Sequence, residues 1–491
     1  MDFLGDLTAG SGFFLLLALG LALGFEFVNG FHDTANAVAT VIYTHSLKPT
    51  YAVIWSGTWN LLGVLVSTGA VAFGVIALLP AELVINAGSG AGFAMVFALL
   101  ISAIIWNLGT WYLGLPASSS HTLIGSIIGV GLANSLTSGH AFGEGVNWGK
   151  AQEVFSSLLI SPVVGFTCAA LLLLLAKALI HRPELYRAPE TGKAPPLWIR
   201  ALLILTCTGV SFAHGSNDGQ KGMGLIMLIL IGILPGIFAL DLNAKIAPLA
   251  DISQPAIAVI SKHTSPGASL QEKAADDQLS SYLKAGTADS QTFAALATKS
   301  QTITSKIAGK ASFKDISKEN RRALRNDIYL VSKTINKLNK QHVITDKQET
   351  KTLGDYKTQL EKATEFIPSW VKVAVAFALG LGTMIGWKRI VVTVGEKIGK
   401  DHLTYAQGAS AELVAMTTIA AADHFGLPVS TTHVLSSGVA GTMAANRSGL
   451  QMDTLRNLLL AWVLTLPVCV LLGSATYSFG LYIVLNILGL K

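Results

Sequence analysis

The chain has 491 residues, of which 51% are hydrophobic and only 13% are charged, with a mean hydropathy of +0.53. This composition excludes a water-soluble globular protein and indicates a membrane protein with several spans. The net charge of +6 does not indicate a nucleic-acid-binding protein, because residues 241–368 alone hold 19 basic and 14 acidic residues of interspersed sign.

The first half of the chain contains five apolar segments, at about residues 12–44, 51–79, 91–113, 115–134 and 152–180. The fourth is short and begins with the polar sequence GLPASSSH at residues 114–121, so it is not an ordinary span. Irregular backbone at membrane depth is tolerated only where protein or a water-filled cavity satisfies it. We therefore expect this segment to be a re-entrant hairpin.

The second half repeats this order, with apolar segments near residues 199–239, 369–394, 403–424, 427–446 and 455–489. Two pairs of motifs mark the duplication. FVNGFHDTAN at 27–36 aligns with FAHGSNDGQK at 212–221, and GLPASSSH aligns with GLPVSTTH at 426–433. Polar, glycine-containing segments at matching positions of two apolar halves indicate the binding site of a transporter.

The predicted fold is an all-α polytopic membrane protein with two inverted-topology repeats, broken helices, re-entrant hairpins and a soluble helical insert. If each first segment is broken and crosses twice, each half has five crossings, and the second half is inverted. The basic linker and the insert then lie on one side, which the positive-inside rule makes cytoplasmic. The domains are 1–180, first membrane repeat; 181–198, basic linker; 199–240, start of the second membrane repeat; 241–368, cytoplasmic helical insert; and 369–491, remainder of the second repeat.

The two GLP motifs have the features of helix starts that bind an anion. Serine and threonine cap free N–H groups, and the positive end of the helix dipole attracts negative charge. Two facing starts supply donors from several directions, as a tetrahedral oxyanion requires. Phosphate fits this arrangement, and so does sulfate. The candidate phosphate-binding residues are Ser118, Ser119, Ser120, Thr122, Ser430, Thr431 and Thr432.

The remaining motif pair adds Asp33 and Asp218, and its only fixed cation is Lys221, which could neutralise Asp218 or contact the anion. Two carboxylates beside a dianion at low dielectric are unfavourable, so either they are protonated or cations bind with the anion. Both outcomes predict cation-coupled uptake. The sequence indicates no cofactor, and it does not identify a metal site.

Other functions are disfavoured by the duplication. An intramembrane hydrolase needs one asymmetric nucleophile and base, whereas the Ser/His cluster occurs twice, so we predict that the protein is not an enzyme. A channel rarely requires paired acidic residues at an anion site. His121 and His433 are expected to orient the hairpin tips, and Glu26 is expected to be structural. Glu412 is either part of a proton path or a side chain that snorkels at the lipid edge.

The segments NGFHDTAN and HGSNDGQKG together with the paired GLPxSxxH segments resemble the inorganic phosphate transporter (PiT) family, and specifically its bacterial low-affinity permeases. The resemblance covers the membrane part of the chain. It implies phosphate symport by two inverted repeats in a multi-pass protein of the inner membrane that forms a homodimer. It also implies that phosphate is held by the hydroxyls of the two hairpins and that the coupling ions lie near Asp33, Asn36, Asn217 and Asp218.

One position departs from the pattern of sodium-coupled relatives, where an asparagine usually precedes the first aspartate. Here the residue is His32, although Asn217 keeps the pattern in the second motif. A titratable imidazole beside Asp33 favours proton coupling. We therefore expect H⁺ symport of phosphate as a neutral complex with Mg²⁺ or another divalent metal, with Na⁺ coupling as the alternative.

Overall fold

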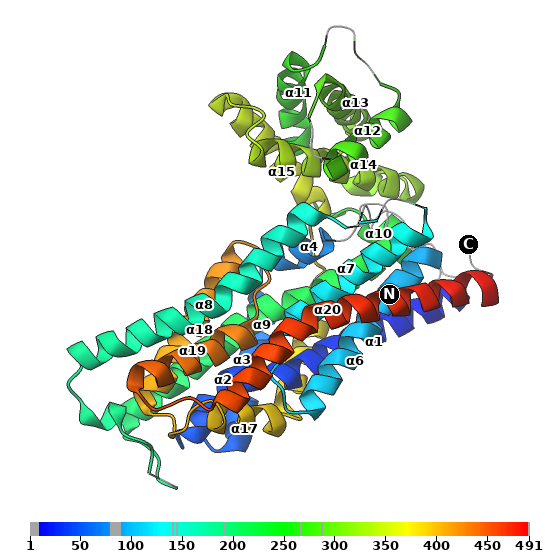
Figure 1. Ribbon diagram of the computed structural model, residues 1–491. Helices are drawn as coiled ribbons and strands as arrows, with labels where there is room; N and C mark the ends of the chain where they lie inside the picture. Colours follow the sequence, from blue (N-terminus) through cyan, green and yellow to red (C-terminus); the bar gives the residue numbers. More distant parts are fainter. Residues whose placement is uncertain are drawn as a thin grey trace. The chain divides into compact units, whose positions relative to one another are not determined.

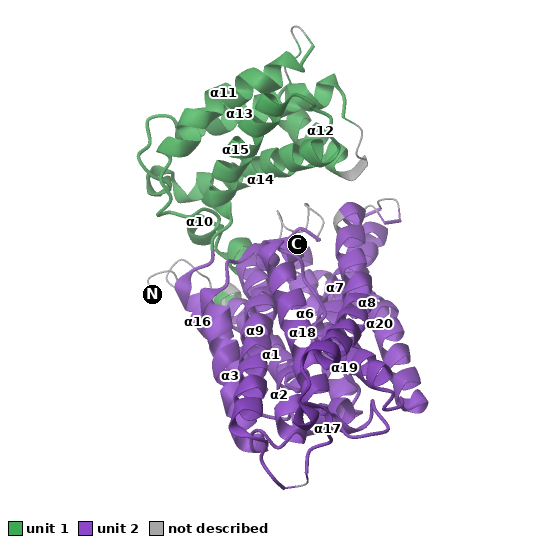
Figure 2. Cartoon of the chain, turned by 90° about the vertical axis from the view of Figure 1, so that its left-hand side faces the viewer, with its two compact units in different colours: residues 1–12, 230–366 green, residues 13–229, 367–491 purple. Residues whose placement is uncertain are grey.

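The computed structural model describes residues 9–78, 90–139, 142–143, 146–190, 192–265, 268, 270–285 and 288–489. In these ranges the regular elements are helices, and no β-strand occurs. The chain forms two compact units (Figure 2), one comprising residues 1–12 and 230–366 and the other residues 13–229 and 367–491. The second unit contains all four motifs identified from the sequence.

The larger unit is built from long apolar helices (Figure 1). The first half supplies α1 (Ala9–Asp33), α2 (Ala35–Tyr43), α3 (Pro49–Val66), α4 (Ala70–Ile76), α6 (Gly90–Tyr112), α7 (Ser119–Thr137) and α8 (Trp148–Leu179). The second half supplies α9 (Leu197–Ile233), α16 (Ser369–Met384), α17 (Lys388–Glu396), α18 (Tyr405–His424), α19 (Thr431–Asn446) and α20 (Met452–Tyr482).

Five helical segments are long and apolar enough to cross a membrane, and up to seven when two bent helix pairs are each counted as a span. The protein is therefore a multi-pass membrane protein, as the composition indicates. One bent pair is α3 with α4, whose axes differ by 78°. The five single segments are Gly12–Tyr43, Gly90–Tyr112, Ala151–Leu179, Leu197–Ile233 and Met452–Ile487.

Helices of the two halves pack against each other in matching pairs. Helix α7 lies against α20, and its counterpart α19 lies against α8. Both contacts depend on a glycine: a Cβ atom on Gly129 would lie 2.1 Å from the Val470 carbonyl oxygen, and one on Gly441 would lie 2.1 Å from that of Phe166. Such small residues allow membrane helices to approach to backbone contact.

The prediction that both first segments are broken helices is wrong for the second half. Helix α9 runs uninterrupted for 37 residues through Asp218. In the first half only Thr34 separates α1 from α2, and it keeps helical dihedral angles while its hydroxyl donates to Gly30 O (2.7 Å). The glycines of these motifs permit close helix contacts instead of unwinding, and side chains rather than free backbone groups surround the aspartates.

The continuous α9 removes the double crossing from which the placement of linker and insert on one side was derived, and that placement stays a prediction. A helix of 37 residues is about 55 Å long and forms one candidate membrane span. The linker leads into its N-terminal end, whereas the insert follows its C-terminal end. The two segments therefore adjoin opposite ends of α9, because the double crossing on which the prediction depended does not occur.

The smaller unit is a helical bundle with its own apolar core, which includes Leu279, Leu324 and Tyr356. A buried charge cluster lies within it: Lys299 Nζ is 2.6 Å from Asp276 Oδ1 and 2.8 Å from Asp327 Oδ1. Burial opposes the charge of Lys299, but these two carboxylates outweigh it and raise the pKa of the lysine. Its helices are α10 (Pro235–Phe238), α11 (Ala247–Lys262), α12 (Glu272–Ala285), α13 (Ser290–Ile307), α14 (Lys318–Lys340) and α15 (Lys347–Thr364).

Candidate functional site

The four sequence motifs meet inside the larger unit. Asp33 ends α1, Asp218 lies in the middle of α9, and the two GLP motifs lead into α7 and α19. Both aspartates are buried, with exposed fractions of 2% for Asp33 and 0% for Asp218. The sequence-based expectation that these segments converge is thus met by the packing of the helices.

The two GLP motifs start helices in the way that the sequence predicts. Ser118 Oγ accepts a hydrogen bond from the His121 N–H, and Ser430 Oγ accepts one from the His433 N–H, both at 3.2 Å. The two tips are neighbours: Ser120 Oγ donates to the Val429 carbonyl (2.8 Å). Behind them the rings of His121 and His433 lie 4.7 Å apart, so the starts of α7 and α19 face a common position.

The Asp33 carboxylate occupies that common position. Thr432 Oγ1 donates to Oδ1 (2.8 Å), and Ser119 Oγ donates to Oδ2 (3.0 Å). The His32 imidazole lies on the other side, with Nδ1 3.0 Å from Asp33 Oδ1 and Nε2 3.0 Å from Thr110 Oγ1. A negatively charged group is therefore held between two helix N-termini, where the helix dipoles stabilise it.

Asp218 is paired with the only fixed cation of the motifs. Lys221, which is 1% exposed, places Nζ 2.8 Å from Asp218 Oδ1 and donates to Ser120 Oγ (2.6 Å). The open question about this lysine is thereby answered in part, because it contacts both Asp218 and a hydroxyl of the first hairpin. The charges of Asp33, Asp218 and Lys221 together give the site a net charge of −1 when the imidazoles are neutral.

His214 connects the two aspartates and was missed by the sequence analysis. Its Nε2 lies 3.5 Å from Asp218 Oδ2 and 3.7 Å from Asp33 Oδ2, and its Nδ1 lies 2.8 Å from Asn60 Oδ1. One ligand atom from each of these three acidic and imidazole side chains lies within 4.8 Å of the others, as in a cation site. The sequence signal that could have identified His214 is its alignment with Asn29 in the first motif.

The other predicted residues divide into three groups. Asn36 Nδ2 donates to Thr431 Oγ1 (3.2 Å) and Thr432 Oγ1 (3.0 Å), so it joins the central cluster. Asn217 instead supports the second hairpin, since its Nδ2 donates to the Leu427 carbonyl (3.2 Å). Thr122 Oγ1 donates to the Ser118 carbonyl (2.9 Å) of its own helix and does not point into the cluster.

Asp423, at the end of α18, is a second polar contact that the sequence analysis missed. Its carboxylate accepts hydrogen bonds from Ser216 Oγ (2.7 Å) and Gln220 Nε2 (2.5 Å) of α9. Gln220 Oε1 in turn accepts from the Val71 N–H of α4 (2.9 Å). These bonds hold α4, α9 and α18 together beside the second hairpin.

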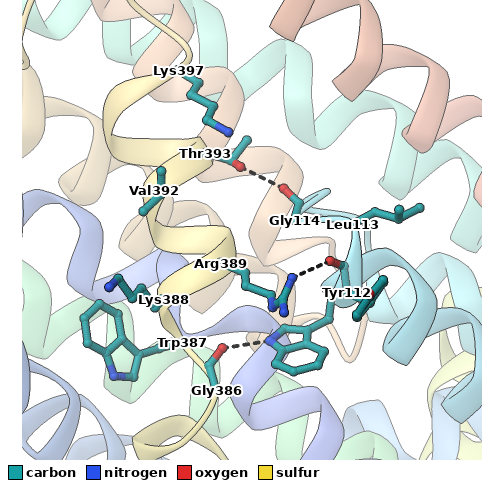
Figure 3. A pocket seen from close by; sticks show the side chains of 11 residues that line it. Tyr112, Leu113, Gly114, Gly386, Trp387, Lys388, Arg389, Val392, Thr393 and Lys397 are labelled. Atoms are coloured by element: carbon teal, nitrogen blue, oxygen red, sulfur yellow. Dashed lines mark hydrogen bonds between the residues drawn. The ribbon is translucent and has the colours of Figure 1, made fainter.

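A pocket of about 660 Å³ lies beside the first hairpin, between the end of α6 and α17 (Figure 3). Its walls are tied by Trp111 Nε1, which donates to Gly386 O (2.7 Å), and by Arg389 Nη1, which donates to Tyr112 O (2.9 Å). Lys388 and Lys397 add positive charge to its lining. A hollow with basic residues thus borders the first GLP motif.

Comparison with known proteins decides the family. The model of the PHO4 phosphate transporter family matches residues 29–473, a range that begins within the first motif and includes the other three. The chain belongs to this family. The low-affinity inorganic phosphate transporters PitA and PitB of Escherichia coli K12 are 43% and 41% identical, over 96% of this chain and 97% and 98% of theirs. These relatives are transporters, which confirms the prediction that the protein is not an enzyme.

More distant relatives cover a similar share of the chain. A probable low-affinity inorganic phosphate transporter of Bacillus subtilis is 29% identical over 94% of this chain and 96% of its own. A solved structure entitled "The sodium-dependent phosphate transporter" has a TM-score of 0.52 at 19% identity, covering 95% of this chain and 98% of that one. This structural likeness supports the helical fold.

Proposed function

We propose that the protein takes up inorganic phosphate by symport with H⁺ across the bacterial inner membrane, with phosphate accompanied by a divalent metal such as Mg²⁺ as cargo. Membership in the phosphate transporter family and the high identity to low-affinity phosphate transporters support phosphate as the substrate. The observation that carries the proposal is the position of the Asp33 carboxylate between the starts of α7 and α19.

A phosphate oxygen can take the place of the Asp33 carboxylate as hydrogen-bond acceptor. The hydroxyls of Ser119 and Thr432 now donate to that carboxylate. When Asp33 is protonated or pairs with a cation, the same hydroxyls and the α7 and α19 termini are available to the substrate. Lys221, at the Ser120 hydroxyl, supplies a further donor.

Charge balance supports coupling to protons. Asp33, Asp218 and Lys221 sum to −1, and a dianion without compensation would raise this to −3 in a buried site. His32 and His214 both contact the carboxylates, and imidazoles take up protons near neutral pH. A divalent cation bound to the phosphate would cancel the two negative charges of the dianion.

Matched contacts support two structural repeats that move against each other. A Cβ atom on Gly30 would lie 2.4 Å from Leu379 O in α16, and one on its counterpart Gly215 would lie 2.1 Å from Asn60 O in α3. The first helix of each half, α1 or α9, thus packs in the same way against a helix of the other half. Alternating access by rocking of one bundle against the other follows from such a design, and we extend the proposal to a homodimer.

Reconstitution in liposomes tests the coupling ion. Uptake of labelled phosphate is measured under an imposed pH gradient, under a sodium gradient, and with or without added Mg²⁺. We expect accumulation driven by the pH gradient and enhanced by Mg²⁺. Accumulation under the sodium gradient alone would establish the second candidate, Na⁺ symport, which the likeness to the sodium-dependent structure favours.

A further inference from the structure

The face of α1 that lies toward α9 carries three polar side chains, Glu26, Asn29 and Asp33, spaced three and four residues apart. Two of them have partners on α9. Asn29 Nδ2 lies 3.5 Å from Asp218 Oδ2, and Asp33 Oδ2 lies 3.7 Å from His214 Nε2. The row of polar contacts between the helices therefore extends from the hairpin tips toward Glu26, about two helical turns away.

Glu26 is completely buried, and neither of its carboxyl oxygens has a hydrogen-bond partner with normal geometry among the described residues. The side chain packs directly on the backbone of α9 at Gly222. A Cβ atom there would lie 2.2 Å from Glu26 Cγ and 2.6 Å from Oε1. Only glycine at this position leaves room for the carboxyl group.

A carboxylate without a hydrogen bond is strongly disfavoured in such a place, which favours a neutral, protonated Glu26 in this conformation. The charged groups that face it are Asp218, Lys221 and His214, all from α9. The lysine is the only fixed cation among them, and it is already engaged with Asp218 and Ser120. No free counterion is thus left among these groups for an ionised Glu26.

We propose that Glu26 is a proton-carrying residue of the transport cycle, an inference that rests on the proposed H⁺ symport. Phosphate at the hairpin tips adds negative charge beside Lys221, which favours the protonated form of Glu26. After phosphate leaves, the O–H bond of Glu26 breaks, the electron pair stays on the carboxylate, and the proton passes to water. Lys221 then becomes the counterion of the carboxylate.

Reciprocity makes this arrangement a coupling device. If bound phosphate increases the affinity of Glu26 for a proton, a proton on Glu26 increases the affinity for phosphate by the same factor. The loaded carrier therefore crosses with both, and the unloaded carrier returns after losing both. Exchange of phosphate for phosphate needs only the protonated, loaded form.

The variant Glu26→Gln tests the inference because it keeps the shape of the neutral group and cannot release a proton. In liposomes we expect pH-gradient-driven accumulation of labelled phosphate to be lost, while phosphate–phosphate exchange stays within about twofold of the unsubstituted protein. The half-saturating phosphate concentration for exchange should also vary less with pH. Glu190→Gln, at a side chain that is 73% exposed, is the matched control and should behave as the unsubstituted protein.

Infrared spectroscopy of the purified protein gives a readout that does not depend on transport. With phosphate present, a carbonyl band of a protonated carboxyl should be observed, and this band should disappear in Glu26→Gln. Normal accumulation by this variant, or loss of exchange together with accumulation, would overturn the inference, as would an unchanged infrared band. If the unsubstituted protein accumulates phosphate only under a sodium gradient, the proposed function itself fails, and this is decided before the variant is compared.

Discussion

Asp33 is the residue on which the starts of α7 and α19 converge. It receives hydroxyl groups from α7 and α19 and an imidazole from its own helix, and these groups come from segments 86 and 399 residues away as well as from the adjacent position. A buried carboxylate with this many donors stabilises the closed arrangement of the two tips. Removing its charge should therefore affect transport more strongly than folding.

We predict that Asp33→Asn strongly reduces gradient-driven phosphate accumulation. Hydrogen bonds to charged groups contribute about 1.5–3 kcal/mol each, so loss of one such bond should reduce transport by about 10-fold to 100-fold. The measurement is labelled phosphate uptake in liposomes under a pH gradient. Accumulation at the unsubstituted level would remove Asp33 from the coupling machinery.

The hydroxyl groups that surround Asp33 can be tested in the same assay. The double substitution Ser119→Ala with Thr432→Ala removes two neutral donors, each worth about 0.5–1.5 kcal/mol. The half-saturating phosphate concentration should rise by about 5-fold to 100-fold. Thr137→Ala at the far end of α7, where the hydroxyl donates to Ala133 O (3.0 Å), is the control. An equal effect of the control would count against the assignment.

At the scale of elements, the contacts between the halves explain why glycines recur in α7 and α19. Gly129 and Gly441 each permit backbone contact with a long helix of the other half.

The sequence could predict the motif pairs, the helix starts at Ser119 and Thr431, and the meeting of the four motifs. Pro–hydroxyl sequences and duplication are patterns that can be read from the sequence alone.

The continuity of α9 could not be predicted in this way. Glycine and polar residues within an apolar segment indicate either an unwound helix or a close helix contact, and only the partner helix distinguishes them. At Gly215 the partner is Asn60 of α3, far away in the sequence. For the same reason, the role of His214 between Asp33 and Asp218 depends on packing that local sequence does not encode.

We predict that Gly129→Val destabilises the protein by about 1–3 kcal/mol or more, because the added side chain overlaps the Val470 carbonyl. Thermal unfolding in detergent measures the effect. Gly109→Val in α6 is the matched control, since a Cβ atom there has no neighbour within 4 Å. The α7–α20 contact would not be the reason for the glycine if both variants unfolded at the same temperature.

At the scale of the whole molecule, the uninterrupted α9 has the linker at its N-terminal end and the insert after its C-terminal end. We predict that cysteines introduced at Lys193 and Lys310 react with membrane-impermeant reagents from opposite sides. The background would lack Cys168, Cys207 and Cys469, which are the cysteines of the chain. Labelling of both positions from the same side would instead require a second crossing in the segment that forms α9.

The position of Asp33 also has a consequence for ion leak. Because a carboxylate of the protein fills the gap between the starts of α7 and α19, the unloaded carrier presents no vacant electropositive opening to chloride or other small anions. We therefore expect the unloaded carrier to conduct no anion current, and we expect Asp33 to contribute both to this insulation and to selective uptake.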